Sequence, residues 1–153
     1  MRRKLKLPMP KIFFASDHEG FELKKKLIAY FKTLGYTTED CGPYAFNPED
    51  DYPDFITPCA QEVASDQNSL GVIIGKSGEG EAMCANRVKG IRAAVVYSSN
   101  PEIIQLTREH NNANIISLGA GFITNEEACA AVRKFIETPF STSPRHTRRI
   151  NKF

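Results

Sequence analysis

Apolar runs of four or five residues recur along the chain and indicate strands. Three of them, at 12–15, 70–74 and 115–118, are apolar at nearly every position, and 92–96 is a fourth. Continuous apolar runs of this length are typical of strands that helices cover on both faces. A fifth, weaker strand is expected at 36–41, where polar and apolar residues alternate.

Between these runs the apolar positions change to a helical spacing. The clearest helix has one apolar face, formed by Leu23, Leu27, Tyr30, Phe31 and Leu34. Gly35 is expected to end it at the C′ position. Further helices are expected at about 54–64, 82–88, 101–110 and 125–136. Pro58 should lie in the first turn of its helix or kink it, and 42–53, rich in Pro, Asn and Asp, should be a loop.

Strands that alternate with helices predict the α/β class. With right-handed crossovers, they form one doubly wound, Rossmann-like five-stranded parallel sheet with helices on both faces. In the common strand order 2-1-3-4-5, the topological switch lies between the first and third strands. The loops after these strands, at 17–18 and 75–81, would then meet where such folds bind ligands. We expect one domain at 11–153, including a basic C-terminal tail, after a flexible extension at 1–10.

Composition narrows the classes of protein that the chain can belong to. A net charge of +2 argues against a dedicated nucleic-acid binder, and 41% hydrophobic with 25% charged residues is ordinary for a globular protein.

The apolar stretch after the basic start is broken by Pro8, Pro10 and Lys11, unlike a secretory signal. No apolar run approaches the ~20 residues that span a bilayer. The four cysteines form no CxxC pair. We therefore expect a cytoplasmic protein with reduced thiols and neither nucleic-acid nor membrane partners.

The loop at 75–81, with the sequence GKSGEGE, carries the strongest chemical signal. It follows a strand and opens a helix, so free backbone N–H groups and a helix N-terminus gather there and stabilise negative charge. Glu81 adds a carboxylate in the first helical turn. A base beside an anion-stabilising loop is what enolate chemistry needs. The alternative is that Glu81 only interacts favourably with the helix dipole, which normally lowers a carboxyl pKa.

Two nucleotide-binding motifs are excluded by single positions. A P-loop ending in Gly75-Lys76 needs a glycine at position 70, which is Leu70. A GxGxxG pattern that begins at Gly78 fails at Met83.

The three histidines differ in their surroundings. His18 follows Asp17 at the end of a strand, which favours a functional role. His110 ends a helix, where a structural cap and a functional role remain equally open. His146 lies in a basic segment that is either a frayed tail or a phosphate clamp, since Arg145 and Arg149 would share one helical face.

Several segments together resemble a known family. They are SDHEGF at 16–21, DYPD at 51–54, GEG at 78–80 with ANRVKGIR at 85–92, REHNNAN at 108–114 and RHTRRI at 145–150. In this order they resemble the type B ribose-5-phosphate isomerases, a family that includes galactose-6-phosphate isomerase subunits. The resemblance covers the chain from about Lys11 to its end. It implies a Rossmann-like homodimer, or a tetramer built from it, with active sites shared between subunits and with neither metal nor organic cofactor.

The resemblance also implies roles for the matching polar residues. Asp17 would help to hold the sugar, His18 would contact its phosphate, and Tyr52 would line the pocket. His110 would open the sugar ring, with Asn111 of the same motif binding substrate. Phosphate would be gripped by Arg145 and Arg149, with His146 close by.

Relatives are of two types, which differ in their catalytic base. One type has a cysteine directly after the third strand, and the other has a glutamate at the start of the next helix. This chain has Gly75 at the first position and Glu81 at the second, so it resembles the glutamate type. The backbone of 77–80, including Gly78 and Gly80, would hold a cis-enediolate, and Ser77 would relay a proton between its oxygens.

Three positions depart from the family pattern. Lys76 and Glu79 replace smaller or neutral residues, and could tune the choice of substrate or pair with each other. Gly121 stands where many relatives have an arginine that assists phosphate binding, so the grip on phosphate should be weaker or different.

The resulting prediction is an aldose–ketose isomerase of the non-oxidative pentose phosphate pathway that interconverts ribose 5-phosphate and ribulose 5-phosphate. The alternatives are an isomerase of a hexose 6-phosphate (allose or galactose) and a phosphosugar-binding protein that has lost catalysis.

Overall fold

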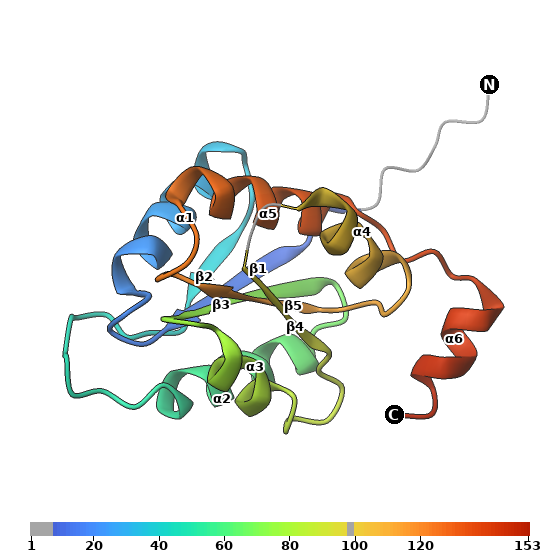
Figure 1. The fold of residues 1–153 in the computed structure, drawn as a ribbon, viewed down its shortest axis with the longest axis horizontal. Coiled ribbons are helices and arrows are strands. Elements are labelled where there is room, and N and C mark those ends of the chain that lie inside the picture. Colours follow the sequence, from blue (N-terminus) through green and yellow to red (C-terminus); the bar gives the residue numbers. More distant parts are fainter. Residues whose placement is uncertain (1–7, 98–99) are drawn as a thin grey trace.

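The computed structural model describes residues 8–97 and 100–153 (Figure 1). The elements of these residues follow the order β1 (Lys11–Ser16), α1 (Phe21–Thr33), β2 (Thr38–Asp40), α2 (Pro53–Ser65), β3 (Ser69–Gly75), α3 (Glu79–Ala85), β4 (Ala93–Val96), α4 (Pro101–Glu109), β5 (Ile115–Gly119), α5 (Asn125–Glu137) and α6 (Pro144–Ile150). The flexible extension expected at 1–10 falls mostly on residues 1–7, which lie outside this description. A five-stranded parallel sheet with helices on both faces confirms the expected fold class.

The strand order is β2-β1-β3-β5-β4, so the expected order 2-1-3-4-5 is wrong at one edge. Burial agrees with this order: every residue of β5 is buried, whereas three of the four residues of β4 are only half-buried. The large side chains of Ile115, Ile116 and Leu118 gain more from full burial than the alanines of β4, which favours β5 at the inner position beside β3. The exchange lies beyond β3, so the switch point between β1 and β3 is retained, and Ser16 lies opposite Ile74 there.

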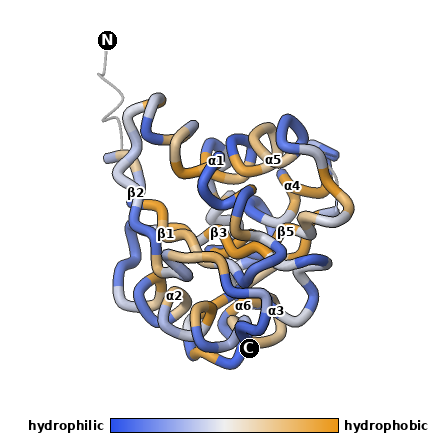
Figure 2. The backbone as a smooth tube through the Cα atoms, turned by 90° about the vertical axis from the view of Figure 1, so that its left-hand side faces the viewer, coloured by the Kyte–Doolittle hydropathy of each residue, from blue (hydrophilic) through white to orange (hydrophobic). Residues whose placement is uncertain are grey.

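The helices form two layers around the sheet. Figure 1 shows α1, α5 and α4 over one face and α2 and α3 over the other. Alternate side chains of β1 enter the two cores, with Ile12 and Phe14 on the α1 side and Phe13 and Ala15 on the α2 side. Apolar positions accordingly concentrate on the central strands (Figure 2).

The helices agree with the sequence periodicity, except that α3 begins at Glu79 and ends at Ala85, three residues earlier than expected at each end. Leu23, Leu27 and Phe31 of α1 are buried, and Gly35 follows the helix with a φ of +87°. This is the left-handed conformation expected at C′. In α2, Pro58 lies inside the helix rather than in its first turn, and the helix continues beyond it to Ser65. No helix of residues 8–97 and 100–153 has the length and apolarity to cross a bilayer.

The last helix lies apart from the two layers. Figure 1 shows α6 beside the end of the sheet at which the strands begin, opposite the ends from which α1 and α3 start. None of its residues is buried. The segment that leads to it is tied to the end of α4, where the Ser141 N–H donates to the Glu109 carbonyl at 3.3 Å.

A buried lysine joins α1 to the long loop before α2. The Lys24 side chain is fully buried, and its Nζ donates to Asp40 Oδ1 at 2.8 Å and to the Pro43 carbonyl at 2.6 Å. Asp40 also accepts from the Gly42 N–H at 2.8 Å. A buried charge is tolerated when it is paired and hydrogen-bonded. Lys24 therefore anchors the start of the loop.

We predict that Lys24→Met lowers the free energy of unfolding by about 2 kcal/mol, because it removes two hydrogen bonds of a charged donor. Chemical denaturation at one fixed protein concentration measures this change. The control is Lys25→Met on the neighbouring, exposed residue, which should stay within about 0.5 kcal/mol of the parent. Equal effects of the two substitutions would contradict an anchoring role.

Candidate active site

The carboxyl ends of β1 and β3 form the first part of the site. The Asp17 N–H donates to the Ile74 carbonyl at 3.3 Å, which joins the ends of the two strands. The buried Asp17 carboxylate accepts from the N–H groups of Glu19 at 2.9 Å and Gly20 at 3.2 Å. Burial raises the pKa of Asp17, although these hydrogen bonds oppose the shift.

Glu81 lies in the first turn of α3 and is buried, with 4% of its surface exposed. Its carboxylate occupies the space beside Gly75, where an added Cβ would lie 1.9 Å from Glu81 Oε1. A side chain at position 75 would therefore displace the carboxylate of Glu81 from its present place. The glycine that ends β3 leaves this space to the glutamate of the next helix.

The pKa of Glu81 is raised, mainly by burial and further by the negative charge of Asp17. The sequence suggested that the helix N-terminus would lower this pKa. Burial already outweighs the helix dipole in the free chain, because desolvation disfavours the ionised form. A carboxylate with a raised pKa is the better proton acceptor.

The loop between β3 and α3 is held by β5 and the turn after it. Gly78 has a φ of +82°, and its carbonyl accepts from Ser117 Oγ at 2.6 Å. The carbonyls of Gly75 and Lys76 accept from the N–H groups of residues 120 and 121, at 2.8 and 3.0 Å. Within the described residues, no group accepts a hydrogen bond from the N–H of Ser77 or Gly78. These two donors remain available to an anion beside Glu81.

His18 and Tyr52 complete this part of the site. His18 Nδ1 lies 2.6 Å from Asp50 Oδ1, which also accepts from the His18 N–H at 3.1 Å. Tyr52 precedes α2, and its hydroxyl lies 2.6 Å from the position that a Cβ on Gly80 would take. Asp50 was missed in the sequence, although its place directly before the matching motif at 51–54 was a usable signal. We call Asp17, His18, Asp50, Tyr52, the loop 75–80 and Glu81 the carboxyl-end cluster.

The other predicted site residues lie on α4, the turn after it and α6. His110 caps α4 and stacks on His146, with ring centroids 4.1 Å apart and an interplanar angle of 17°. Arg145 and Arg149 occur four residues apart on α6, as expected if the tail is helical, and both are exposed. The pKa of His146 is lowered, by partial burial first and then by the neighbouring His110 and arginines. We call His110, Asn111, Arg145, His146 and Arg149 the amino-end cluster.

Two arginines missed in the sequence hold the turn that carries His110. Arg108 donates through Nη1 to Asn112 Oδ1 at 3.1 Å and through Nε to the Thr138 carbonyl at 3.0 Å. Arg92 Nε donates to the Asn112 carbonyl at 2.8 Å. Asn112 has a φ of +45°, so the turn is tight. The bond to Thr138 also links the turn to the segment that leads to α6.

The two clusters lie at opposite ends of the sheet. The first follows the carboxyl ends of β1 and β3, whereas α6 and the end of α4 lie where the strands begin (Figure 1). The structure thus brings Asp17 beside Glu81, as the switch-point argument predicted, since its charge acts on Glu81 and its N–H binds the end of β3. His18 follows Asp17 at the same end of the sheet, where its ring contacts Asp50. The structure does not bring His110, Asn111 or the arginines of α6 to them within one chain.

The departures from the family pattern also have a structural account. Glu79 accepts a hydrogen bond from the Tyr97 hydroxyl, and residues 8–97 and 100–153 contain no ion pair between Glu79 and Lys76. The aliphatic part of Lys76 instead lies beside Gly121, where an added Cβ would be 3.2 Å from Lys76 Cγ. A larger residue at 121 would displace it.

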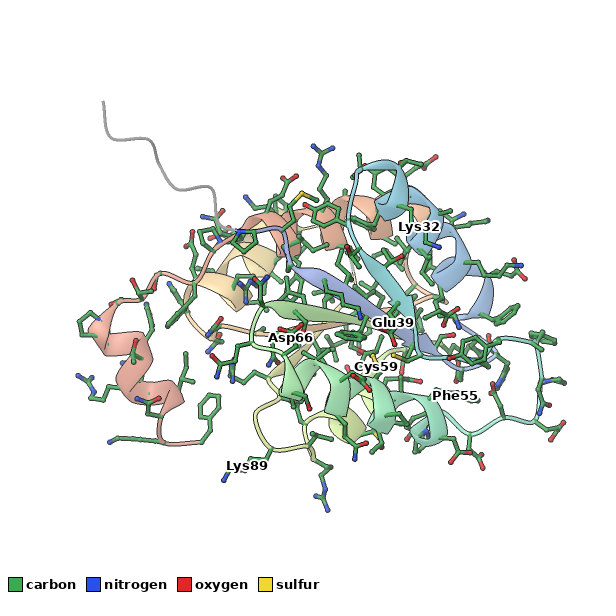
Figure 3. All side chains as sticks on the ribbon, turned by 180° about the vertical axis from the view of Figure 1, so that it is seen from behind. Lys32, Glu39, Phe55, Cys59, Asp66 and Lys89 are labelled. Atoms are coloured by element: carbon green, nitrogen blue, oxygen red, sulfur yellow. The ribbon has the colours of Figure 1, made fainter. Side chains whose placement is uncertain are left out.

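The cysteines are free and do not belong to either cluster. Figure 3 shows Cys59 on α2, between that helix and the sheet, and this residue is fully buried. Cys84 is on α3 with its Sγ 3.3 Å from Thr57 Oγ1.

We predict that Glu81→Gln changes how stability depends on pH. The folded-state pKa of Glu81 is raised, so its stabilising contribution is complete below the unfolded-chain pKa of about 4.3 and is lost as pH rises through the folded-state value. The free energy of unfolding should therefore fall less between pH 4 and pH 7 in Glu81→Gln than in the parent.

Denaturation at several pH values measures this difference. The control is Glu126→Gln, which removes an exposed first-turn carboxylate from α5 and should leave the parent's pH dependence nearly unchanged. A steeper fall in Glu81→Gln than in the parent would contradict the raised pKa.

Comparisons with known proteins agree with one another. The sequence pattern of a family described as Ribose/Galactose Isomerase matches residues 12–153. The chain is 44% identical over 141 residues to ribose-5-phosphate isomerase B of Mycolicibacterium paratuberculosis, across 92% of this chain and 87% of that protein. It is also 41% identical to a probable ribose-5-phosphate isomerase B of Mycoplasma genitalium, across 92% and 91% of the two chains.

Solved structures give the same result. The crystal structure of ribose-5-phosphate isomerase B from Mycoplasma genitalium with bound ribulose-5-phosphate has a TM-score of 0.88 and 40% identity, and covers 93% of this chain and 92% of its own. The corresponding protein of Thermotoga maritima has a TM-score of 0.88 and 40% identity, with 95% and 97% covered.

Proposed function

Because the chain belongs to the ribose/galactose isomerase family, we propose that it interconverts ribose 5-phosphate and ribulose 5-phosphate. Similar proteins carry the name of this activity, and a similar structure holds ribulose-5-phosphate. The observation that carries the proposal is the buried carboxylate of Glu81, with its raised pKa, beside the unbound N–H groups of Ser77 and Gly78.

The reaction moves one proton between adjacent carbons. His110 moves the proton that opens the furanose ring. Glu81 then takes the proton from C2 of the open aldose, and the cis-enediolate that forms is stabilised by the N–H groups of residues 77–80. Ser77 relays a proton from O2 to O1, and Glu81 returns its proton to C1. The product is the ketose, and the base regains its starting state.

The remaining residues bind and orient the substrate. Asp17, Tyr52 and Asn111 hold the sugar, with Gly78 and Gly80 giving the backbone close access to it. The phosphate is bound by His18 and by three residues of the amino-end cluster, Arg145, His146 and Arg149. Binding the phosphate far from C1 and C2 supplies orientation energy for the proton transfer.

We propose that the complete site forms only in a homodimer. A strand of five residues, such as β5, spans roughly 16 Å, which exceeds the reach of side chains at its two ends. A two-fold axis would place the amino-end cluster of one chain against the carboxyl-end cluster of its partner, twice. The exposed α6 and its basic residues support this arrangement, and a tetramer would join two such dimers. The four free thiols support a cytoplasmic location.

A substrate panel tests the function. Purified protein is assayed with ribose 5-phosphate, allose 6-phosphate and galactose 6-phosphate, and we expect turnover to be fastest with ribose 5-phosphate. Glu81→Gln should lower kcat by about a thousandfold or more while a sugar-phosphate inhibitor still binds, because shape is kept and basicity is lost. Cys84→Ser is the control and should keep its activity. Faster turnover of a hexose phosphate, or binding without turnover of any of the three, would overturn the proposal.

We predict that two inactive variants complement each other. His110→Ala and Glu81→Gln each damage one cluster, so a hybrid dimer retains one site in which both residues are intact. Mixing and refolding the two variants in equal amounts should restore about a quarter of parental activity, because half of the dimers are hybrids and each has one intact site of two.

One control mixture and one contrary outcome complete this test. His110→Ala mixed with a second variant of the same cluster, Arg149→Ala, should recover much less, because each hybrid site then lacks one of the two residues. Hybrids shown to form by mass spectrometry, yet inactive for Glu81→Gln with His110→Ala, would exclude the shared site.

A further inference from the structure

Asp50 makes the closest polar contact with His18. Its Oδ1 lies 2.6 Å from His18 Nδ1 and accepts from the His18 backbone N–H at 3.1 Å, so one oxygen meets both the ring and the main chain. The Asp50 side chain is only 5% exposed, whereas His18 is 26% exposed. The ring therefore turns its Nδ1 edge to a buried carboxylate and leaves its other edge accessible.

We propose that Asp50 is a positioning residue that holds His18 in its cationic form, with Nδ1–H on Asp50 and Nε2–H free to donate to the substrate phosphate. This inference rests on the proposed function, because it assigns the partner of Nε2. Asp50 itself does not touch the substrate. Its carboxylate acts through the imidazole, as carboxylates do when they orient the ring of a functional histidine.

The charges around His18 explain why such a residue is needed. Asp17 and Glu19 on its own segment and Asp50 on the loop before α2 all face the ring, with Glu19 Oε1 at 3.8 Å from Nε2. The edge of the Phe46 ring lies against it, with centroids 6.5 Å apart. These carboxylates repel a phosphate dianion, so binding of the phosphate beside His18 needs a cation. A neutral imidazole carries no charge.

The hydrogen bond supplies that charge. The pKa of His18 is raised, first by the hydrogen bond to Asp50 and then, against an opposing effect of burial, by the charges of Asp17, Asp50 and Glu19. An ordinary imidazole, with a pKa of about 6.5, is mostly neutral at pH 8. Asp50 thus extends the range of pH over which His18 remains a charged donor.

The loop that carries Asp50 is anchored to α1 near its start and forms local turns toward its end. Lys24 Nζ binds the Pro43 carbonyl near its start, and the Asp50 N–H donates to the Asn47 carbonyl at 3.2 Å near its end. At the start of α2, the Asp54 N–H donates to the Asp51 carbonyl at 3.2 Å. The carboxylate is therefore presented by a supported segment.

The first test is an NMR titration of the histidine rings, and needs no substrate. The His18 resonance is assigned by its loss in His18→Asn. In Asp50→Asn, which keeps the shape of the side chain, the midpoint of the His18 titration should move to lower pH than in the parent. Glu49→Gln, which removes an exposed charge from the neighbouring residue, is the matched control and should leave the midpoint in place. An unchanged midpoint in Asp50→Asn would overturn the proposal whatever the enzyme's substrate.

The second test is kinetic and uses ribose 5-phosphate. Relative to the parent at the same pH, Asp50→Asn should raise KM roughly tenfold at pH 8, the loss of one charge-assisted contact, and less than about threefold at pH 5.5, where His18 is protonated without help. In a His18→Asn background, Asp50→Asn should add no pH-dependent effect, since the residue through which it acts is gone.

The outcomes separate the proposal from a structural role and from the proposed function. Equal KM changes at both pH values, or the same effect with and without His18, would mean that Asp50 only supports the loop. Absence of parental turnover with ribose 5-phosphate would overturn the function and leave the titration to decide the role of Asp50. Parental unfolding midpoints in Asp50→Asn confirm that the variant is folded.

Discussion

The site depends on burying one carboxyl group, that of Glu81, at the carboxyl ends of two parallel strands. The absence of a side chain at position 75 makes room for it, because the carboxylate lies where the Cβ of a larger residue would be. Two effects act on the same group in opposite directions: the helix N-terminus favours the ionised form, and burial beside Asp17 favours the protonated form. Burial prevails. The group is thereby suited to accept a proton from carbon, at a cost in stability that the rest of the fold must offset.

The polarity of the fold imposes the second constraint. In an α/β sheet the helices run antiparallel to the strands, so residues that follow strands gather at one end and residues that end helices gather at the other. Asp17 and the loop 75–80 belong to the first group, and His110 belongs to the second. A chain of this fold cannot bring the two groups together by itself. In the homodimer proposed above, one two-fold interface would complete two sites at once.

Residues outside the two clusters, together with Asp50, support the loops that carry them. Lys24 anchors the loop before α2, Asp50 on that loop holds His18, and Arg108 ties the turn of His110 to the segment before α6. Each of these is a charged side chain that is at least partly buried and hydrogen-bonded. Buried polar groups of this kind are costly when unpaired, so they favour one arrangement of the loops over others.

The sequence by itself determined the class of the fold, the place of nearly every element and the residues of both clusters except Asp50. Apolar runs and helical periodicity depend on local spacing, and the position of Glu81 after a strand and a glycine loop follows from chain order alone. The switch point between β1 and β3 was also predictable, because it depends only on the first three strands.

Only the tertiary structure decided the order of the outer strands, the pKa of Glu81 and the contacts of Asp50, Lys24 and Arg108. Whether β4 or β5 lies beside β3 depends on how completely each is covered. A pKa depends on solvent exposure and on charges brought near by folding, as Asp17 is brought near Glu81 from 64 residues away in the sequence. These quantities depend on which groups share a volume, and spacing along one chain does not contain that information.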